Sequence, residues 1–168
     1  MRVAVTGTPG TGKTTATKQV ETDLTVVHLN DVIEREGYAA GTDEKRGSVI
    51  ADTDAVAAWL NGREDLLVES HLAHHFPADR VIVLRCHPAD IERRLTDRGD
   101  SEQKARENAE AEALDVVLSE AVAEHGADSV YEVDTTDRDP GDVAAAIESV
   151  IAGERDPAVG TVDFMEYL

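Results

Sequence analysis

The stretch that decides the fold reads Gly7-Thr8-Pro9-Gly10-Thr11-Gly12-Lys13-Thr14. It satisfies the pattern G-x-x-x-x-G-K-[ST] at every fixed position. A β-branched run precedes it at 2–6 and a helical pattern follows at 13–23, which is the strand–loop–helix context that this motif requires. A chance match in a turn rich in Gly and Thr is therefore the weaker interpretation. We expect a nucleoside triphosphate to bind at this loop.

Each residue type in the loop has a chemical reason. Gly10 and Gly12 let backbone N–H groups curl around a phosphate, and the following helix presents its positive N-terminus to the anion. Lys13 is expected to reach between the β- and γ-phosphates, where it also serves catalysis, and the Thr14 hydroxyl to hold Mg²⁺. Thr15 is placed to contact the α-phosphate. ATP and Mg²⁺ are the ligands that this stretch predicts.

Short β-branched runs alternate with helical patterns along the rest of the chain. The expected strands are 3–5, 25–29, 66–68, 81–84 and 130–133, and the expected helices are 13–23, 54–61, 88–97, 101–125 and 140–152. Ser101 is a plausible N-cap and Gly126 a plausible helix end. This alternation predicts one α/β domain over 1–168, with a parallel sheet covered by helices on both faces. The tail after Gly153 is expected to pack back on the body, because it carries large apolar side chains.

The amino-acid composition limits the kinds of partner that the protein can bind and indicates the environment in which it works. The 168 residues include 35 acidic and 16 basic side chains, and the formal net charge is −19. This charge opposes general nucleic-acid binding, which needs a basic surface. The acidic surface, with few lysines, predicts adaptation to high salt. No stretch approaches 18 apolar residues and the first residues do not form a signal peptide, so we expect a soluble, cytoplasmic protein that does not bind membranes.

The single cysteine, Cys86, excludes an intramolecular disulfide and a zinc site built on cysteines. Because it ends an apolar run, we interpret it as a buried structural thiol.

A second polar cluster follows the strand expected at 66–68. Glu69 lies at the end of this strand, where such proteins place the carboxylate that holds magnesium, and His71 is then close enough to orient a water or an acceptor phosphate. His71, His74 and His75 also form an H-x-x-H-H string that could suggest a metal site. We favour the interpretation without such a metal, because Mg²⁺ is a poor match for imidazole.

Basic side chains are concentrated between residues 93 and 106, where Arg93, Arg94, Arg98, Lys104 and Arg106 occur within fourteen residues. Guanidinium groups clamp a transferring phosphoryl group and neutralise the charge that develops on it. We therefore expect a small lid with a hinge near 98–100, in preference to an ordinary solvated helix face. The chain contains neither N-K-x-D nor D-x-x-G, which excludes a GTP switch, and it is too short for a motor ATPase. A small phosphotransferase or a small ATPase remains.

Taken together, these residues resemble the adenylate kinase 6 (CINAP) family in an archaeal, haloarchaeal form. The resemblance covers nearly the whole chain and is carried by GTPGTGKTT at 7–15, HLNDVIEREGY at 28–38, DEKRGSVIADTD at 43–54, VESHLAHHFP at 68–77 and VIVLRCHPADIERRLTDRG at 81–99. It implies a P-loop NTPase fold of three layers with sheet order 2-3-1-4-5, an AMP-binding arm at 28–51 and a lid at 97–107.

The resemblance also implies an activity and the residues that serve it. The reaction would be ATP + AMP ⇌ 2 ADP with Mg²⁺, accompanied by ATPase activity and a role in maturation of the small ribosomal subunit through one of its proteins. Arg98 would contact nucleotide phosphate and His71 would match the family's histidine, while Glu69 stands where the family usually has Asp. Arg35 is a candidate ligand of the AMP phosphate, at a register shifted by about one residue, and Arg138 could stack on adenine. The alternatives are an ATP-driven ribosome assembly factor and a small kinase that acts on another metabolite.

Overall fold

The structure is a computed structural model that describes residues 1–43 and 48–168. Five parallel strands form its main sheet, in the order β2 (Thr25–His28), β5 (Leu66–Glu69), β1 (Arg2–Thr6), β6 (Arg80–Arg85) and β7 (Val130–Asp134). Counted along the chain, these five strands have the order 2-3-1-4-5. The predicted α/β class and strand order are therefore confirmed.

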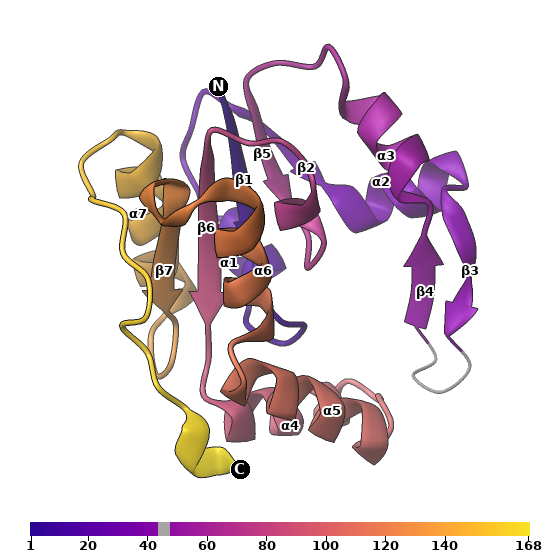
Figure 1. Cartoon of the computed structure of the whole chain (residues 1–168), viewed down its shortest axis with the longest axis vertical. Coiled ribbons are helices and arrows are strands. Elements are labelled where there is room, and N and C mark those ends of the chain that lie inside the picture. Colours follow the sequence, from indigo (N-terminus) through magenta and orange to yellow (C-terminus); the bar gives the residue numbers. More distant parts are fainter. Residues whose placement is uncertain (44–47) are drawn as a thin grey trace.

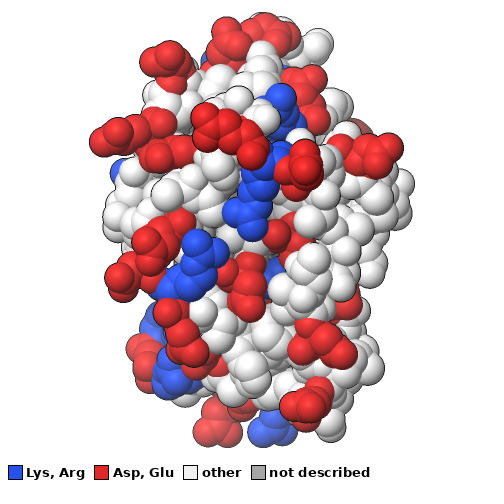
Figure 2. Space-filling view, turned by 90° about the vertical axis from the view of Figure 1, so that its left-hand side faces the viewer, with Lys and Arg blue, Asp and Glu red and all other residues white. Residues whose placement is uncertain are grey.

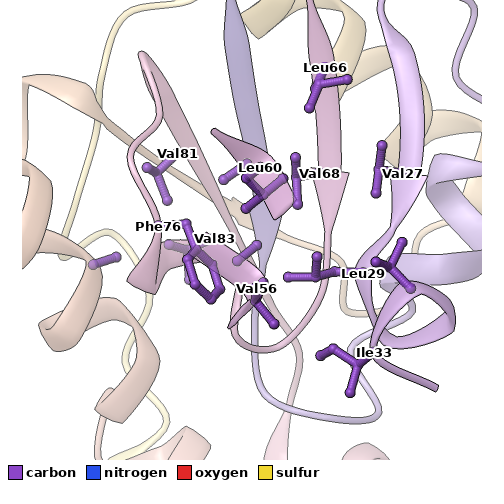
Figure 3. Close-up of a cluster of buried hydrophobic side chains, with 14 of the residues drawn as sticks. Val27, Leu29, Ile33, Val56, Leu60, Leu66, Val68, Phe76, Val81 and Val83 are labelled. Carbon is purple, nitrogen blue, oxygen red and sulfur yellow. The ribbon is translucent and has the colours of Figure 1, made fainter. Parts of the chain in front are cut away.

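Two apolar clusters cover the two faces of the sheet. Side chains from β1, β2, β5 and β6 that point to one face pack with α2 (Leu29–Glu36), α3 (Thr53–Leu60) and α6 (Val116–His125). Figure 3 shows part of this cluster, where Val68 and Val83 of the sheet lie near Leu29, Val56 and Phe76. On the other face, alternate strand residues pack with α1 (Lys13–Thr17) and α7 (Pro140–Ile151). This three-layer arrangement is the one that strands apolar on both faces require.

A third, smaller cluster lies beyond the carboxyl end of β6. There α4 (Pro88–Asp97) packs against α5 (Glu102–Ala113), and Cys86 is buried between Ile91, Leu95 and Ala105. Burial raises the pKa of the Cys86 thiol, which agrees with the structural role predicted for it. Figure 1 shows α4 and α5 together at this end of the sheet, with the hairpin β3 (Ala39–Asp43) and β4 (Ser48–Ala51) at the side of the molecule opposite α7.

Two predicted helices differ from the structure. The helix expected at 13–23 ends at Thr17 and continues only as turns to Val20. The helix expected at 101–125 is two helices, because Asp115 adopts a left-handed conformation with φ of 56° between α5 and α6. Its carboxylate binds the buried Arg85, so a tertiary contact overrides the helical pattern. The Ser101 N-cap is confirmed, since its hydroxyl accepts a hydrogen bond from the Lys104 N–H.

The tail packs on the body, as predicted. Ala158 pairs with Tyr131 beside β7, and Thr161 donates two hydrogen bonds to the Glu132 carboxylate. A last 3₁₀ turn, η3 (Met165–Tyr167), brings Tyr167 to Glu92 of α4, to which its hydroxyl donates a hydrogen bond. The short 3₁₀ turns η1 (Ala73–His75) and η2 (Ala127–Ser129) complete the described elements.

On the face that Figure 2 shows, acidic side chains are more widespread than Lys and Arg side chains, which lie among them. In the described part of the chain, no helix is both long enough and apolar enough to span a bilayer.

Candidate functional site

One large cleft lies at the carboxyl edge of the sheet and has a volume of about 1270 Å³. Its walls include the loop 9–16, the arm, the end of β5 with the segment after it, the α4–α5 region, and the stretch from Thr135 to the start of α7. Among its described lining residues are five basic side chains, namely Lys13, Arg94, Arg98, Lys104 and Arg138, and two acidic ones, Glu34 and Glu69. A local excess of positive charge in a protein of net charge −19 marks this cleft as a site for anions.

The loop from Gly7 has the backbone that a phosphate cradle needs. Gly10 and Gly12 have φ angles of 92° and 88°, in the left-handed region that side chains with a Cβ rarely adopt. Lys13 is buried, and its ammonium group donates hydrogen bonds to the carbonyls of Gly7 (2.9 Å) and Thr8 (3.1 Å). Burial lowers the pKa of Lys13 to about 8, although Glu69 acts in the opposite direction. The structure thus brings the predicted residues of the loop together on the cleft wall.

Thr14 and Glu69 lie side by side, as the prediction of a metal site requires. The Thr14 hydroxyl donates a hydrogen bond to Glu69 Oε1 (3.2 Å), and Glu69 Oε2 lies 2.8 Å from His28 Nδ1. Glu69 is nearly buried at the end of β5. A hydroxyl and a carboxylate oxygen are ligands that suit Mg²⁺, so the residues present fit this ion. The contact with His28, which the sequence analysis missed, orients the carboxylate.

His71 lines the cleft, but its two neighbours in the H-x-x-H-H string do not. Burial, assisted by the positive charge of Lys13, lowers the pKa of His71 to about 4. Its imidazole is therefore neutral near pH 7 and can act by hydrogen bonding but not by charge. His74 and His75 instead face Glu120 and Glu124 of α6.

The basic segment 93–106, which overlaps the predicted lid at 97–107, supplies three of the basic groups in the cleft. Arg98 Nε donates a hydrogen bond to Asp100 Oδ2 (2.7 Å), and Lys104 Nζ lies 3.2 Å from the other oxygen of the same carboxylate. Burial acts to raise the pKa of Asp100, but the hydrogen bonds from Arg98 and Lys104 outweigh it and lower this pKa. Arg94 donates to the carbonyl of Gly10 (3.1 Å). That residues 97–107 move as a lid remains a prediction.

The two remaining predicted ligands differ in position. Arg138 lines the cleft together with Pro140, a position from which its guanidinium could contact a nucleobase. Its guanidinium also donates a hydrogen bond to the Asp134 carbonyl (3.2 Å). Arg35 is not among the residues that line the cleft, and its Nε lies 3.4 Å from Glu36 Oε1 on the exposed side of α2. The structure does not bring Arg35 together with the other residues. Its role as a substrate ligand remains a prediction, and residues 44–47 of the predicted arm lie outside the described part of the chain.

A buried ionic network behind the cleft was not predicted. Arg85 is fully buried and contacts the carboxylates of Glu112 (3.1 Å), Glu132 (2.6 Å) and Asp115. Burial acts to lower the pKa of Arg85, but these carboxylates more than offset it and raise this pKa, so the guanidinium stays charged. One sequence signal exists: Glu112 shares the buried face of α5 with Ala105 and Ala109, where an acid is out of place without a partner.

Comparison with known proteins agrees with this fold. Residues 3–115 match the model of a family described as AAA domain. A protein of Natronomonas pharaonis named "Putative adenylate kinase" is 68% identical over the full length of both chains. Proteins of the same name are 60% identical in Halobacterium salinarum, over the full length of both, and 41% identical in Methanosarcina acetivorans, over 93% of this chain and 91% of the relative.

Solved structures of much lower identity share the fold. A shikimate kinase from Bacteroides thetaiotaomicron superposes with a TM-score of 0.56 at 16% identity, over 91% of this chain and 98% of its own. A sulfotransferase from Alicyclobacillus acidocaldarius gives a TM-score of 0.54 at 11% identity, over 98% of this chain and 86% of its own. These two show the fold alone. These archaeal proteins are full-length relatives of the chain, and on the family match over residues 3–115 the chain belongs to the AAA domain family.

Proposed function

We propose that this protein is an adenylate kinase, which transfers the γ-phosphoryl group of ATP to AMP and yields two ADP. The observation that carries the proposal is the continuous cleft that joins the phosphate-binding loop to the arm. Its volume of about 1270 Å³ exceeds the range of about 300–1,000 Å³ that is common for pockets of one small ligand, so it has room for two nucleotides. The name of the full-length relatives supports the same assignment.

In this proposal the chain catalyses by positioning and by neutralising charge, with no covalent intermediate. Gly10, Gly12 and Thr15 hold the triphosphate, and Lys13 neutralises the β- and γ-phosphates. Arg98, supported by Arg94 and Lys104, faces the phosphoryl group in transit. Arg138 lies beside the adenine of ATP. No side chain has to gain or lose a proton during transfer between two phosphates.

Mg²⁺ is part of the proposal as the ion carried with ATP. Thr14 and Glu69 would hold it or its waters, since their oxygens lie together at the strand end. When bound, Mg²⁺ supplies positive charge that neutralises the triphosphate. The adenylate kinase 6 family, which the chain resembles, usually has the shorter aspartate at the position of Glu69. The hydrogen bond between Glu69 and His28 fixes where the carboxylate oxygens of Glu69 lie.

The acceptor side of the cleft is the arm. The arm residues that line the cleft are mostly uncharged: Asn30, Ile33, Gly37 and Ala39, with Glu34 as the charged exception. A mostly apolar slot with a few polar groups suits a nucleobase and ribose better than a second highly charged group. For Arg35 to contact the AMP phosphate, as proposed from the sequence, the arm would have to move toward the loop when AMP binds.

A second candidate is ATP hydrolysis in the service of small-subunit ribosome assembly: His71 favours the hydrolysis, and the ribosomal role is what the family resemblance implies. This imidazole lies in the cleft and is neutral at pH 7, so it can orient a water by accepting or donating a hydrogen bond. The partners in this case would be a ribosomal protein and the small ribosomal subunit. In both candidates the protein would work in a saline cytoplasm. The net charge of −19 supports this proposal, because salt screens the repulsion between acidic side chains.

A panel of nucleoside monophosphates, tested with MgATP in high-salt buffer, distinguishes these candidates. The kinase proposal expects ADP formation to be strongly stimulated by AMP, and the panel ranks AMP against dAMP and CMP. Release of inorganic phosphate that is the same with and without every acceptor would support the hydrolytic candidate, and the absence of any acceptor-dependent ADP formation would refute the kinase.

A further inference from the structure

The other two histidines of the H-x-x-H-H string form a cluster outside the cleft. His74 Nε2 lies 2.7 Å from Glu120 Oε2, and His75 Nε2 lies 3.7 Å from the same oxygen. One ligand atom from each of the three residues lies within 4.8 Å of the other two. His74 and His75 belong to η1 after β5, and Glu120 comes from α6, which packs against η1.

The other ring nitrogen of each histidine is already bound. His74 Nδ1 lies 2.7 Å from the Thr6 hydroxyl, and His75 Nδ1 lies 2.8 Å from Glu124 Oε1. Metal-binding histidines in proteins characteristically use one nitrogen for the ion and the other for a carboxylate or another polar partner. The Thr6 hydroxyl can donate or accept, so it tolerates the tautomer in which His74 Nε2 is free. Both rings therefore direct Nε2 toward the same carboxylate.

We propose that His74, His75 and Glu120 bind a divalent transition-metal ion, Zn²⁺ in particular, at a site separate from the cleft. Two imidazoles and one carboxylate form a ligand set known for Zn²⁺, with a fourth position open to water. Zn²⁺ forms bonds of about 2.0–2.1 Å, so two ligand atoms of a tetrahedral site lie roughly 3.3 Å apart. The distances from Glu120 Oε2 to Nε2 of His74 (2.7 Å) and of His75 (3.7 Å) lie on either side of this value.

The burial of the cluster suits a bound ion with access from solvent. His74 is buried, whereas His75 and Glu120 are exposed. His75 and Glu124 also line a surface depression of about 430 Å³, through which an ion can enter.

The ion would link η1 to α6 at the base of the segment that carries His71. It would thus stabilise this segment without touching the cleft. The sequence analysis set the string aside because it considered only a metal shared with the triphosphate, and the structure separates His71 from the other two histidines.

Calorimetric titration with Zn²⁺ tests the site, in the presence of excess Mg²⁺ and high KCl to saturate the acidic surface. We expect one equivalent of Zn²⁺ to bind, and Co²⁺ to give the visible absorption of a four- or five-coordinate site. His75→Ala and Glu120→Gln should weaken binding about 100-fold or more, and Glu124→Gln about 10–100-fold, the usual effect of a residue that orients a ligand. His87→Asn is the control, since it removes an exposed imidazole that caps α4.

Thermal unfolding provides a second readout, because an ion that binds the folded state raises the melting temperature. Zn²⁺ should raise it in the wild type and in His87→Asn, but not in His75→Ala or Glu120→Gln. Two results would overturn the proposal: no saturable binding in the wild type, or several equivalents bound with equal affinity by the wild type and all variants.

Discussion

Thr8 in the phosphate-binding loop donates a hydrogen bond of 3.2 Å to Glu112, a residue 104 positions later in α5. The same carboxylate binds Arg85 at the end of β6 and accepts a hydrogen bond from the Cys86 N–H. The loop is therefore held from behind by a buried ionic network, so its position depends on charges that no ligand touches.

Replacement of Arg85 tests how much this network contributes. Arg85→Met keeps the volume but leaves the buried carboxylates of Glu112 and Glu132 without their cation, and we expect it to cost about 3–5 kcal/mol in unfolding free energy. Urea unfolding in high KCl measures the change. Arg93→Met is the matched control, because Arg93 is exposed and pairs with Asp90 on α4, where such a pair contributes about 0–1 kcal/mol. Equal stability of the two variants would show that the network is dispensable.

This network also marks the limit of what the sequence predicts. The strand runs and the loop motif are local patterns, and they predicted the five-stranded sheet and the position of Lys13 and Thr14. The break at Asp115 is not local, because that residue turns left-handed where its carboxylate meets Arg85, 30 residues earlier. A continuous apolar stripe at 114–122 cannot reveal such a contact.

In the candidate site too, local motifs were predictable and contacts between distant segments were not. Residues within a motif, such as Gly10, Gly12 and Lys13, were found where they were predicted. The contacts that position other candidate residues, namely His28 with Glu69 and Asp100 with both Arg98 and Lys104, became visible only when the chain was folded. The helix α2 and the hairpin β3–β4 were expected only as an arm, since their short and partly polar segments carry a weak pattern.

Arg98 provides a test of the positive charge in the cleft. Its removal in Arg98→Ala should lower kcat by about 100- to 1000-fold, the usual effect of removing one donor that stabilises the transition state. Arg93→Ala, five residues earlier and outside the cleft lining, is the control and should keep nearly full activity. Steady-state kinetics in which MgATP and AMP are each varied at a saturating concentration of the other measure kcat and KM of both variants. A rise in KM with kcat unchanged would mean that Arg98 binds substrate without serving the transfer.

Glu69 provides a test of the metal site. Glu69→Gln keeps the shape of the side chain and removes its charge, so we expect the Mg²⁺ concentration for half-maximal activity to rise about 10–100-fold. Glu69→Asp restores the charge and should recover most of the response. Asp31→Asn, an exposed acid of α2, controls for the loss of a negative charge. An unchanged Mg²⁺ requirement in Glu69→Gln would exclude this carboxylate from the site.

The net charge of −19 predicts a dependence on salt. Acidic side chains repel one another across the surface, and the Debye length falls from about 10 Å at 0.1 M salt to about 3 Å at 1 M. The urea midpoint should therefore rise as KCl is increased over this range, since screening relieves the repulsion more in the compact state than in the unfolded chain. A midpoint that is flat or falls would show that the acidic surface is no adaptation to salt.

The most direct test of the proposed function is the stoichiometry of the reaction with MgATP and AMP in high KCl. We expect two ADP for each AMP consumed, little inorganic phosphate, and no transfer by a folded Lys13→Ala variant, because the ammonium group that neutralises the phosphates is lost. Circular dichroism of that variant confirms that the fold is intact. Normal turnover in Lys13→Ala, or one ADP and one phosphate formed for each ATP regardless of AMP, would contradict the assignment.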